Sequence, residues 1–526
     1  MRLSPLSKDI AWRERGIDSL VGALGVLALA PFHAWPAMLL SVAMMYVRLS
    51  TRATPAAGYS TAFWTGMGYF GVGMVWIAQA FVERGPEFIP LILPLVVGLF
   101  ILLSIFWGIA GWAFVRVQPQ GPWRVAGFVS FLWLAEFTRG HLFGGFPWNL
   151  HGYAFDAGTA LSQSASVFGV YGLSLVVLAI GALLGQAWKN RAPIPAVLAA
   201  TLLGTNFGYG MWRLNSAKVE LLEGPRLRLV HVPFRQREMM QRERSIELTN
   251  QFFSETLSAP LEGITHIVWP EGAVRGLAIE NEDFLSVFPN ALPETQSLPV
   301  FLFSSIREEW KPDPDGGVER LFYNSAVAAA YPDRAPAIAA FSDKKRLVPF
   351  SEYVPFPDIL SAIGFEAIAT SFTPAPDKNT SNYPGLPPVS VQICYEVLFP
   401  GLTEGEPEFI LNQSNDAWFG NWHGPAQHAA TARMRAVEEG APILRSAANG
   451  WSGTIDSYGR WQERMGPDER GYLDVGLPTR IAPTPFNRLT NIMLLLIILS
   501  VATSTIVAGR FKPRGVGQTG VPVGGG

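Results

Sequence analysis

The single cysteine of this 526-residue chain, Cys394, stands where a nucleophile could be presented. It closes residues 389–394, a run of mostly small and β-branched residues that follows two prolines and predicts a short buried strand. A side chain at the end of a strand enters a turn, where chains usually place reactive groups. Without such a context, a lone cysteine is more often a small hydrophobic residue of the core.

Two other stretches supply the groups that a thiol nucleophile lacks. A thiol needs a base to accept its proton, and a developing oxyanion needs a positively charged donor. Glu271 follows the apolar residues 266–270 and could be the base, or merely a surface acid after a strand. Lys344 and Lys345 compete for the role of donor, and at least one of them is expected to be a solvated residue of a basic turn.

The composition indicates a membrane protein. Hydrophobic residues make up 49% of the chain and charged residues only 16%, with 34 Phe and 17 Trp. The net charge of −2 gives no reason to expect nucleic-acid binding. One cysteine excludes an intramolecular disulfide, and no two histidines have metal-ligand spacing on one helix, so we expect no metal and no cofactor.

Eight apolar segments could cross a membrane if the shorter ones extend into flanking residues. They are residues 17–32, 35–47, 58–82, 88–115, 122–137, 165–188, 193–212 and 489–509. Lys and Arg gather in alternate connections, so the positive-inside rule predicts cytoplasmic termini and a long outward-facing segment. This prediction requires residues 31–36 to turn the chain, because without that turn one span is lost and the sidedness inverts.

Residues 213–485 differ in kind from the rest of the chain. Short apolar runs predict strands, and two longer patterns predict helices at 238–257 and 427–440. Strands separated by helices suggest α/β layers. The predicted strands are 227–232, 266–269, 300–303, 325–330, 389–394 and 409–412. The predicted domains are a seven-span membrane domain at 1–212, a catalytic domain at 213–485, an eighth span at 486–512 and a disordered tail at 513–526.

Several motifs together resemble one known family. They are Trp-Pro-Glu at 269–271, Asp-Lys-x-x-Leu-Val-Pro-Phe-x-Glu-Tyr-Val-Pro at 343–355, Ile-Cys-Tyr-Glu at 393–396, Ser-Asn-Asp-Ala-Trp-Phe-Gly at 414–420 and Gly-Phe-Pro-Trp at 145–148. This set is similar to the apolipoprotein N-acyltransferases, which are membrane-embedded members of the nitrilase (carbon–nitrogen hydrolase) superfamily. The resemblance covers most of the chain and implies an αββα sandwich for the 213–485 domain.

The resemblance also implies roles for individual residues. Glu271 would be the catalytic base and Cys394 the nucleophile. The family's lysine lies eight residues before the acid of the Pro-Phe-x-Glu motif, which selects Lys344 over Lys345 as the oxyanion-side cation. Supporting roles fall to Glu352, Tyr395 and Glu396. A purely structural ion pair is the alternative for Glu352.

Two tryptophans and one histidine complete the set of candidate residues. Trp418 resembles a substrate-contacting aromatic residue, with simple packing as its alternative. Trp148 follows the fifth predicted span and is a second candidate for substrate binding, with an interfacial anchor as its alternative. We expect His428 to pack in a helix rather than to catalyse.

The sequence departs from the family pattern around the site. Arg346 stands where His is usual, Ser351 where Gly is usual, and Gly272 where a hydroxyl residue is common. Residues 232–236 replace an Asn-containing stretch, and Met239 and Met240 replace a Trp. We expect these departures to affect substrate entry and acyl-chain preference rather than the chemistry.

The resemblance implies an inner-membrane acyltransferase that acts as a monomer without a cofactor. Its acyl donor would be a phospholipid and its acceptor a diacylglyceryl lipoprotein, with the catalytic domain in the periplasm and both termini in the cytoplasm. One alternative is a membrane-tethered amidase or nitrilase for small soluble substrates, although such substrates would need no spans. Another is a non-catalytic lipid-binding or transport protein, which would leave the Glu, Lys and Cys set unexplained.

Overall fold

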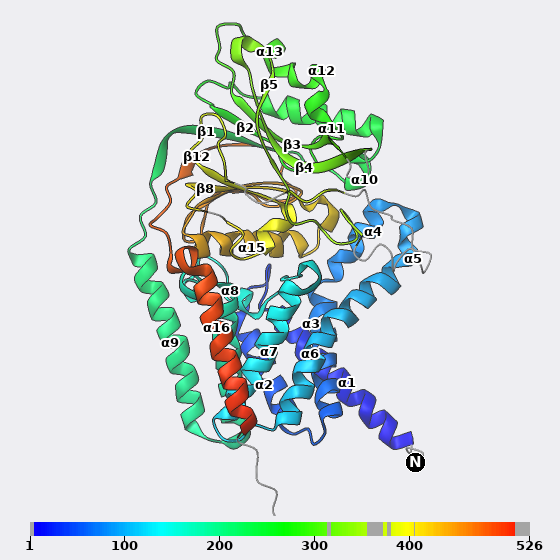
Figure 1. Cartoon of the computed structure of the whole chain (residues 1–526), viewed down its shortest axis with the longest axis vertical. Helices are drawn as coiled ribbons and strands as arrows, with labels where there is room; N and C mark the ends of the chain where they lie inside the picture. The colour runs from blue at the N-terminus through cyan, green and yellow to red at the C-terminus, as the bar shows by residue number, and fades with distance from the viewer. Residues whose placement is uncertain (1–4, 313–316, 355–371, 376–379, 404, 511–526) are drawn as a thin grey trace, which may run out of the picture.

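The computed structural model describes residues 5–312, 317–354, 372–375, 380–403 and 405–510. Figure 1 shows a bundle of long helices with an α/β domain seated on one end of it. Helix α9 rises along the bundle and leads into the α/β domain, and helix α16 returns from that domain along the bundle. The predicted tail at 513–526 lies outside the described residues.

The long helices lie where the sequence predicts apolar segments. They are α1 (Pro5–Val26), α2 (Trp35–Ser50), α3 (Pro55–Gly73), α6 (Val97–Val117), α7 (Trp123–His141), α8 (Ala165–Asn190), α9 (Pro193–Asn215) and α16 (Pro485–Arg510). Shorter elements between α3 and α6 include α4 (Ala78–Arg84), α5 (Ile89–Leu91) and the π-helix η3 (Ile92–Val96). Helices α1 and α2 are separate and pack together, so the chain turns between Val26 and Trp35 as predicted.

The prediction of eight spans is not confirmed. Among the described residues, two continuous helices are long and apolar enough to cross a membrane, at residues 86–117 and 165–190. A third candidate combines Pro55–Gly73 with Val75–Arg84, which meet at a bend of 54°. Two of the other long helices fall short for evident reasons: α2 has only 16 residues, and the first half of α1 carries several charges.

The α/β domain contains two six-stranded sheets. The first has the order β12-β1-β2-β3-β4-β5 and the second β11-β10-β9-β8-β7-β6. Strands β1, β2 and β3 run parallel, as do β7, β8 and β9. The strands of the first sheet are β1 (Leu221–His231), β2 (His266–Val268), β3 (Val300–Pro312), β4 (Val318–Ala330), β5 (Ala337–Asp343) and β12 (Gly471–Pro478). Those of the second are β6 (Thr380–Ser381), β7 (Val389–Ile393), β8 (Phe409–Asn415), β9 (Ile443–Ala448), β10 (Ser452–Ile455) and β11 (Trp461–Met465).

Helices cover both outer faces of the two sheets. Helices α10 (Gln236–Met239), α11 (Arg242–Thr256), α12 (Glu282–Leu285) and α13 (Val287–Ala291) lie on the side of the first sheet, and α15 (Gly424–Glu439) lies between the second sheet and the bundle (Figure 1). Leu229 and Leu302 of one sheet pack with Val391 and Leu411 of the other in a single buried cluster. Each such side chain contributes roughly 1.5–3 kcal/mol when fully buried. The layers form the predicted αββα sandwich.

Candidate active site

The three candidate residues each follow the carboxyl end of a strand of the sandwich. Glu271 comes shortly after β2, Lys344 directly after β5, and Cys394 directly after β7. Strand β5 is antiparallel to β4, and β4 is antiparallel to β3, so β5 runs in the same direction as β2 and β3. The carboxyl ends of strands that share a direction meet at one edge, which is where α/β sheets usually place their sites.

Cys394 occupies a strained turn between β7 and the 3₁₀ helix η9 (Cys394–Leu398). Its φ of 49° lies in the left-handed region, which costs a non-glycine residue roughly 1–2 kcal/mol. The residue is 9% exposed, and its thiol sits at the rim of the core between the two sheets. The surrounding structure must therefore hold this conformation in place.

Glu396 joins two turns, the one that holds Cys394 (called the nucleophile turn) and the one that holds Lys344. Its carboxylate accepts backbone N–H hydrogen bonds from Ile393 at 2.7 Å, Lys345 at 2.7 Å and Arg346 at 3.1 Å. The side chain is fully buried, and burial raises its pKa to about 6 although these N–H groups and Lys344 oppose the rise. One carboxylate thus fixes the distance between the turn of Lys344 and the turn of Cys394.

The Lys344 ammonium lies within a cage of carboxylates. Its Nζ is 2.8 Å from Glu352 Oε1 and 3.7 Å from Glu271 Oε1, and the residue is 1% exposed. Burial alone would lower its pKa, but the charges of Glu352 and Glu271 outweigh burial and raise it. Lys344 therefore stays protonated and can stabilise negative charge.

Asn324 on β4 joins the two acids of this cage. Its Nδ2 donates to Glu271 Oε1 at 2.7 Å and to Glu352 Oε1 at 3.1 Å. The second oxygen of Glu271, Oε2, is buried and accepts no hydrogen bond from the described residues. Sequence reasoning missed Asn324, whose only signal is a polar residue next to the apolar run 325–330. Glu271 is oriented through one oxygen, which leaves the other to accept a proton.

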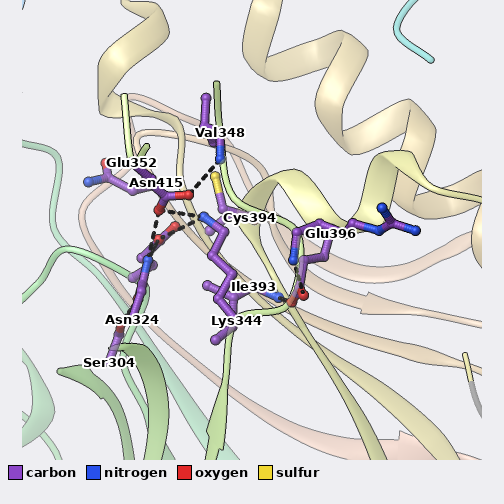
Figure 2. A network of polar contacts seen from close by, with 12 residues as sticks. Ser304, Asn324, Lys344, Val348, Glu352, Ile393, Cys394, Glu396 and Asn415 are labelled. Carbon is purple, nitrogen blue, oxygen red and sulfur yellow. Dashed lines mark hydrogen bonds and ion pairs between the residues drawn. The ribbon is translucent and has the colours of Figure 1, made fainter. Parts of the chain in front are cut away.

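The surroundings of Cys394 raise the pKa of its thiol. Burial raises its pKa well above the ordinary value and the Glu271 carboxylate raises it further, while Lys344 and a backbone hydrogen bond from Asn415 oppose the rise. Cys394 is therefore a thiol at rest, and it could act as a nucleophile only if a base removed its proton during the reaction. Figure 2 shows the sulfur beside the Lys344 amine, with Glu352 and Asn324 around the same amine.

The remaining predicted residues lie around this cluster. Tyr395 donates from its hydroxyl to the Gly145 carbonyl at 2.8 Å, which ties the nucleophile turn to the helical bundle. Trp418 is partly buried at the rim, with the Arg84 guanidinium 5.7 Å from its ring centre. Trp148 is only 3% exposed and donates to Gln427 at 2.9 Å. Substrate contact by the two tryptophans stays a prediction.

The side chain of Asn415 accounts for the glycine at position 272, one of the departures from the family pattern. Gly272 has a φ of 81°, and a Cβ placed there would lie 2.3 Å from Asn415 Nδ2. That Nδ2 donates to Gln236 at 2.8 Å, so the side chain of Asn415 occupies the space that a larger residue at 272 would need. Among the other departures, Arg346 is exposed over the Phe399 ring, and Ser351 accepts a hydrogen bond from Arg84 at 3.4 Å.

A buried lysine flanked by two glutamates, beside a cysteine on a strand-end turn, gives the site a base, a cation and a nucleophile suited to acyl transfer. Among the described residues, no group of three or more His, Cys, Asp or Glu side chains could hold a metal ion. Fold and site together define a carbon–nitrogen hydrolase with a helical domain attached, and the carbon-nitrogen hydrolase family matches residues 236–484.

The rest of the chain specifies the family further. The apolipoprotein N-acyltransferase N-terminal domain matches residues 21–183. Apolipoprotein N-acyltransferases of Rhodopseudomonas palustris and Caulobacter vibrioides are 31% and 32% identical, each over 96% of both chains. That of Rhizobium rhizogenes is 33% identical over 86% of this chain and 88% of its own. The chain belongs to the apolipoprotein N-acyltransferase family.

Proposed function

We propose that this enzyme transfers an acyl chain from a membrane phospholipid to the α-amino group of a diacylglyceryl-cysteine lipoprotein, through a thioester on Cys394. The observation that carries the proposal is the cage of Glu271, Asn324 and Glu352 around Lys344, next to a strained cysteine turn. It supplies the three groups that covalent acyl transfer requires.

The first half-reaction loads the enzyme. Glu271 accepts the thiol proton through its unpaired Oε2 while sulfur attacks the ester carbonyl of the phospholipid. Lys344 stabilises the oxyanion, because it stays protonated and already lies beside the thiol. The C–O bond of the tetrahedral intermediate breaks, and the leaving alkoxide takes the proton from Glu271. Lysophospholipid departs, and the acyl group stays on sulfur.

The second half-reaction transfers the acyl group. The free α-amine of the lipoprotein attacks the thioester carbonyl, and Lys344 again stabilises the oxyanion. Glu271 accepts a proton from the amine nitrogen, the C–S bond breaks, and the proton returns to sulfur. The products are an amide and the free thiol of Cys394, so the enzyme is ready for another phospholipid. One nucleophile serves two sequential partners, so the kinetics should be ping-pong.

For the membrane arrangement we propose eight spans, seven within residues 1–212 and one within 486–512, with residues 213–485 in the periplasm and both termini in the cytoplasm. Three connections that carry basic residues support this topology, because they converge on one carbonyl. Arg124 donates to Ser50 O at 2.7 Å, and Lys189 donates to the same oxygen at 3.2 Å. This cluster marks the positive side of the bundle, which faces the cytoplasm in bacterial inner-membrane proteins.

Reporter fusions test this topology. A reporter placed after Trp212 and one placed after Arg514 should lie on opposite sides of the membrane. Two reporters on the same side would refute the eight-span arrangement but would not bear on the proposed acyl-transfer mechanism.

The contacts between the site and the bundle favour lipid substrates over the amidase alternative. Tyr395 binds the Gly145 carbonyl, and its ring centre lies 6.4 Å from that of Phe146. Residues next to the nucleophile therefore pack against a loop of the bundle, where a lipid ester would approach. An amidase for small soluble substrates would not need this attachment.

A transfer assay tests the proposed function. Purified enzyme in detergent should move a labelled acyl chain from phospholipid to a diacylglyceryl lipopeptide that has a free α-amine. The same lipopeptide with an acetylated amine should accept nothing, because an amide nitrogen is a poor nucleophile. Hydrolysis of the phospholipid to free fatty acid without transfer would instead favour a hydrolase.

A further inference from the structure

The backbone carbonyl of the nucleophile is held by a histidine from another layer of the fold. His428 lies on α15 and is completely buried. Its Nε2 is 3.1 Å from the carbonyl oxygen of Cys394, and its Nδ1 is 2.7 Å from Asp416 Oδ1. A carbonyl oxygen can only accept, so Nε2 is the donor to Cys394, while Nδ1 faces both the Asp416 carboxylate and Arg445 Nη2, the latter at 3.4 Å. The ring therefore bridges the residue after β8 and the nucleophile turn.

A buried ionic cluster fixes the orientation of this ring. Asp416 also accepts from Arg445 Nη2 at 2.7 Å, and Arg445 donates to Ser414 at 3.1 Å and to the Trp451 carbonyl at 3.1 Å. Burial would raise the pKa of Asp416, but His428 and Arg445 outweigh burial and lower it. Asp416 is therefore a carboxylate, which can accept from both partners.

The helical bundle holds His428 from the other side. The ring of Trp148 lies 5.4 Å from that of His428, and Trp148 Nε1 donates to Gln427 at 2.9 Å. Gln427 in turn donates to the Gly73 carbonyl at the end of α3 at 3.2 Å. Arg139 on α7 donates to the Trp148 carbonyl at 2.9 Å. His428 is thus clamped between the second sheet and the bundle.

We propose that His428 is a positioning residue, which holds the Cys394 peptide in its left-handed conformation and couples the packing of the bundle to the nucleophile. The proposal rests on the proposed function, since the step affected is acylation of Cys394. The φ of 49° is unfavourable for cysteine. The hydrogen bond from His428 to the Cys394 carbonyl fixes the plane of the peptide that follows Cys394. A thiol misplaced by about 1 Å can lose roughly 10²-fold in rate.

Two substitutions of His428 separate its two hydrogen bonds. The amide nitrogen of Gln lies as many bonds from Cα as Nε2 of His, so His428→Gln can still donate to the Cys394 carbonyl. The amide nitrogen of Asn corresponds to Nδ1, so His428→Asn can donate to Asp416 only. A positioning role predicts that Asn lowers the rate constant for acylation by about 10–100-fold, while Gln stays within a few-fold of the natural enzyme. The KM for phospholipid should not change in either variant.

Alkylation of Cys394 by iodoacetamide gives an independent readout of thiol placement that needs no lipid. It should show the same order, with His428→Asn slower than His428→Gln. His266→Gln is the matched control, because His266 is also buried and its Nε2 lies 2.8 Å from a backbone carbonyl, that of Pro384, which belongs neither to the nucleophile turn nor to the contacts of Trp148, Gln427 and Gly73. That control should react like the natural enzyme.

Equal alkylation rates for the Gln and Asn variants, at equal thermal stability, would overturn the proposal. If the Asn variant does not fold, Trp148→Phe decides, because it keeps an aromatic ring beside His428 and removes the N–H that reaches Gln427. Slower alkylation in this variant supports the coupling, and an unchanged rate contradicts it. If the natural enzyme is alkylated but never acylated by phospholipid, the proposed function fails, while the order of the variants still decides the role of His428.

Discussion

The carboxylate of Glu396 accepts a hydrogen bond of 2.7 Å from the backbone N–H of Lys345, directly after Lys344. The same carboxylate accepts one of 2.7 Å from the backbone N–H of Ile393, directly before Cys394. Neither bond involves a reacting atom. Together they set the separation between Lys344 and Cys394, which lie on different sheets of the sandwich.

Glu396→Gln should therefore damage both rate and stability. The amide of glutamine would direct its N–H₂ group at a backbone N–H donor and leave at least one of the three N–H groups without an acceptor. A lost hydrogen bond to a buried charge costs about 1.5–3 kcal/mol. We expect denaturant titration to show a loss of this order and acylation of Cys394 to fall at least tenfold. Glu463→Gln, at an exposed residue of β11, is the control and should change neither quantity.

The two adjacent lysines should respond differently to removal. Lys344→Ala deletes the buried cation beside the thiol and leaves Glu271 and Glu352 without it, so the acylation rate should fall by about 10²–10³-fold. Lys345→Ala keeps the backbone N–H that Glu396 uses, and it should stay close to the natural rate. Single-turnover acylation measures both. A severe loss in Lys345→Ala with little effect in Lys344→Ala would shift the assignment by one residue.

Asn324→Asp should move the pH dependence of acylation. A carboxylate at this position would face Glu271 and Glu352, and a neighbouring like charge raises the pKa of an acid. The base would then stay protonated to higher pH, so the rising limb of the pH–rate profile should shift to higher pH. Ser304→Ala is the control, because Ser304 touches Asn324 at 3.5 Å from the side away from the acids. An unchanged pH–rate profile would show that Asn324 has no electrostatic effect on the base.

The link between α15 and the bundle should depend on pH. Glu438 accepts from the Val170 backbone N–H at 2.6 Å, and burial raises its pKa to about 7 from the ordinary 4.5, against the opposing Arg435. The folded state holds this proton more tightly than the unfolded state, so the natural enzyme loses stability as pH rises from about 4.5 through 7. Glu438→Gln cannot ionise and avoids that loss.

The Tm difference, Glu438→Gln minus the natural enzyme, should therefore increase between about pH 5 and pH 8. Thermal unfolding in one detergent at each pH measures it. The substitution also changes the contacts of Arg435, which adds an offset to the Tm difference at every pH. The prediction therefore concerns how the Tm difference changes with pH. A difference that is constant or decreases with pH would contradict the raised pKa.

The sequence could place the candidate site residues at strand ends because strand ends and motif spacing are local properties. Cys394, Glu271 and Lys344 each follow a strand, and the family motif selected Lys344 over Lys345. It also predicted the positions of the long helices, since those depend on continuous apolar runs. It could not predict which of those helices are apolar and long enough to pass as membrane spans.

The supporting residues were harder to predict from the sequence because their contacts depend on which strands become neighbours. Asn324 reaches the acids only through the pairing of β4 with β3 and β5. Strand β9 was missed since it contains the buried Arg445, and β11 was missed since its middle residues are polar and exposed. From the sequence, His428 is expected to be a packing residue of a helix. Its contact with the Cys394 carbonyl could not be predicted, because it depends on how α15 packs on the second sheet.

Mass spectrometry of the enzyme after incubation with phospholipid alone is the direct test of a thioester on Cys394. We predict an adduct on Cys394 equal in mass to one acyl chain, removed by hydroxylamine and cleared by a lipopeptide with a free α-amine. Glu271→Gln should show no adduct, because its thiol has lost the base. If the natural enzyme forms no adduct with phospholipid, yet transfers acyl chains when both substrates are present, the covalent mechanism is wrong.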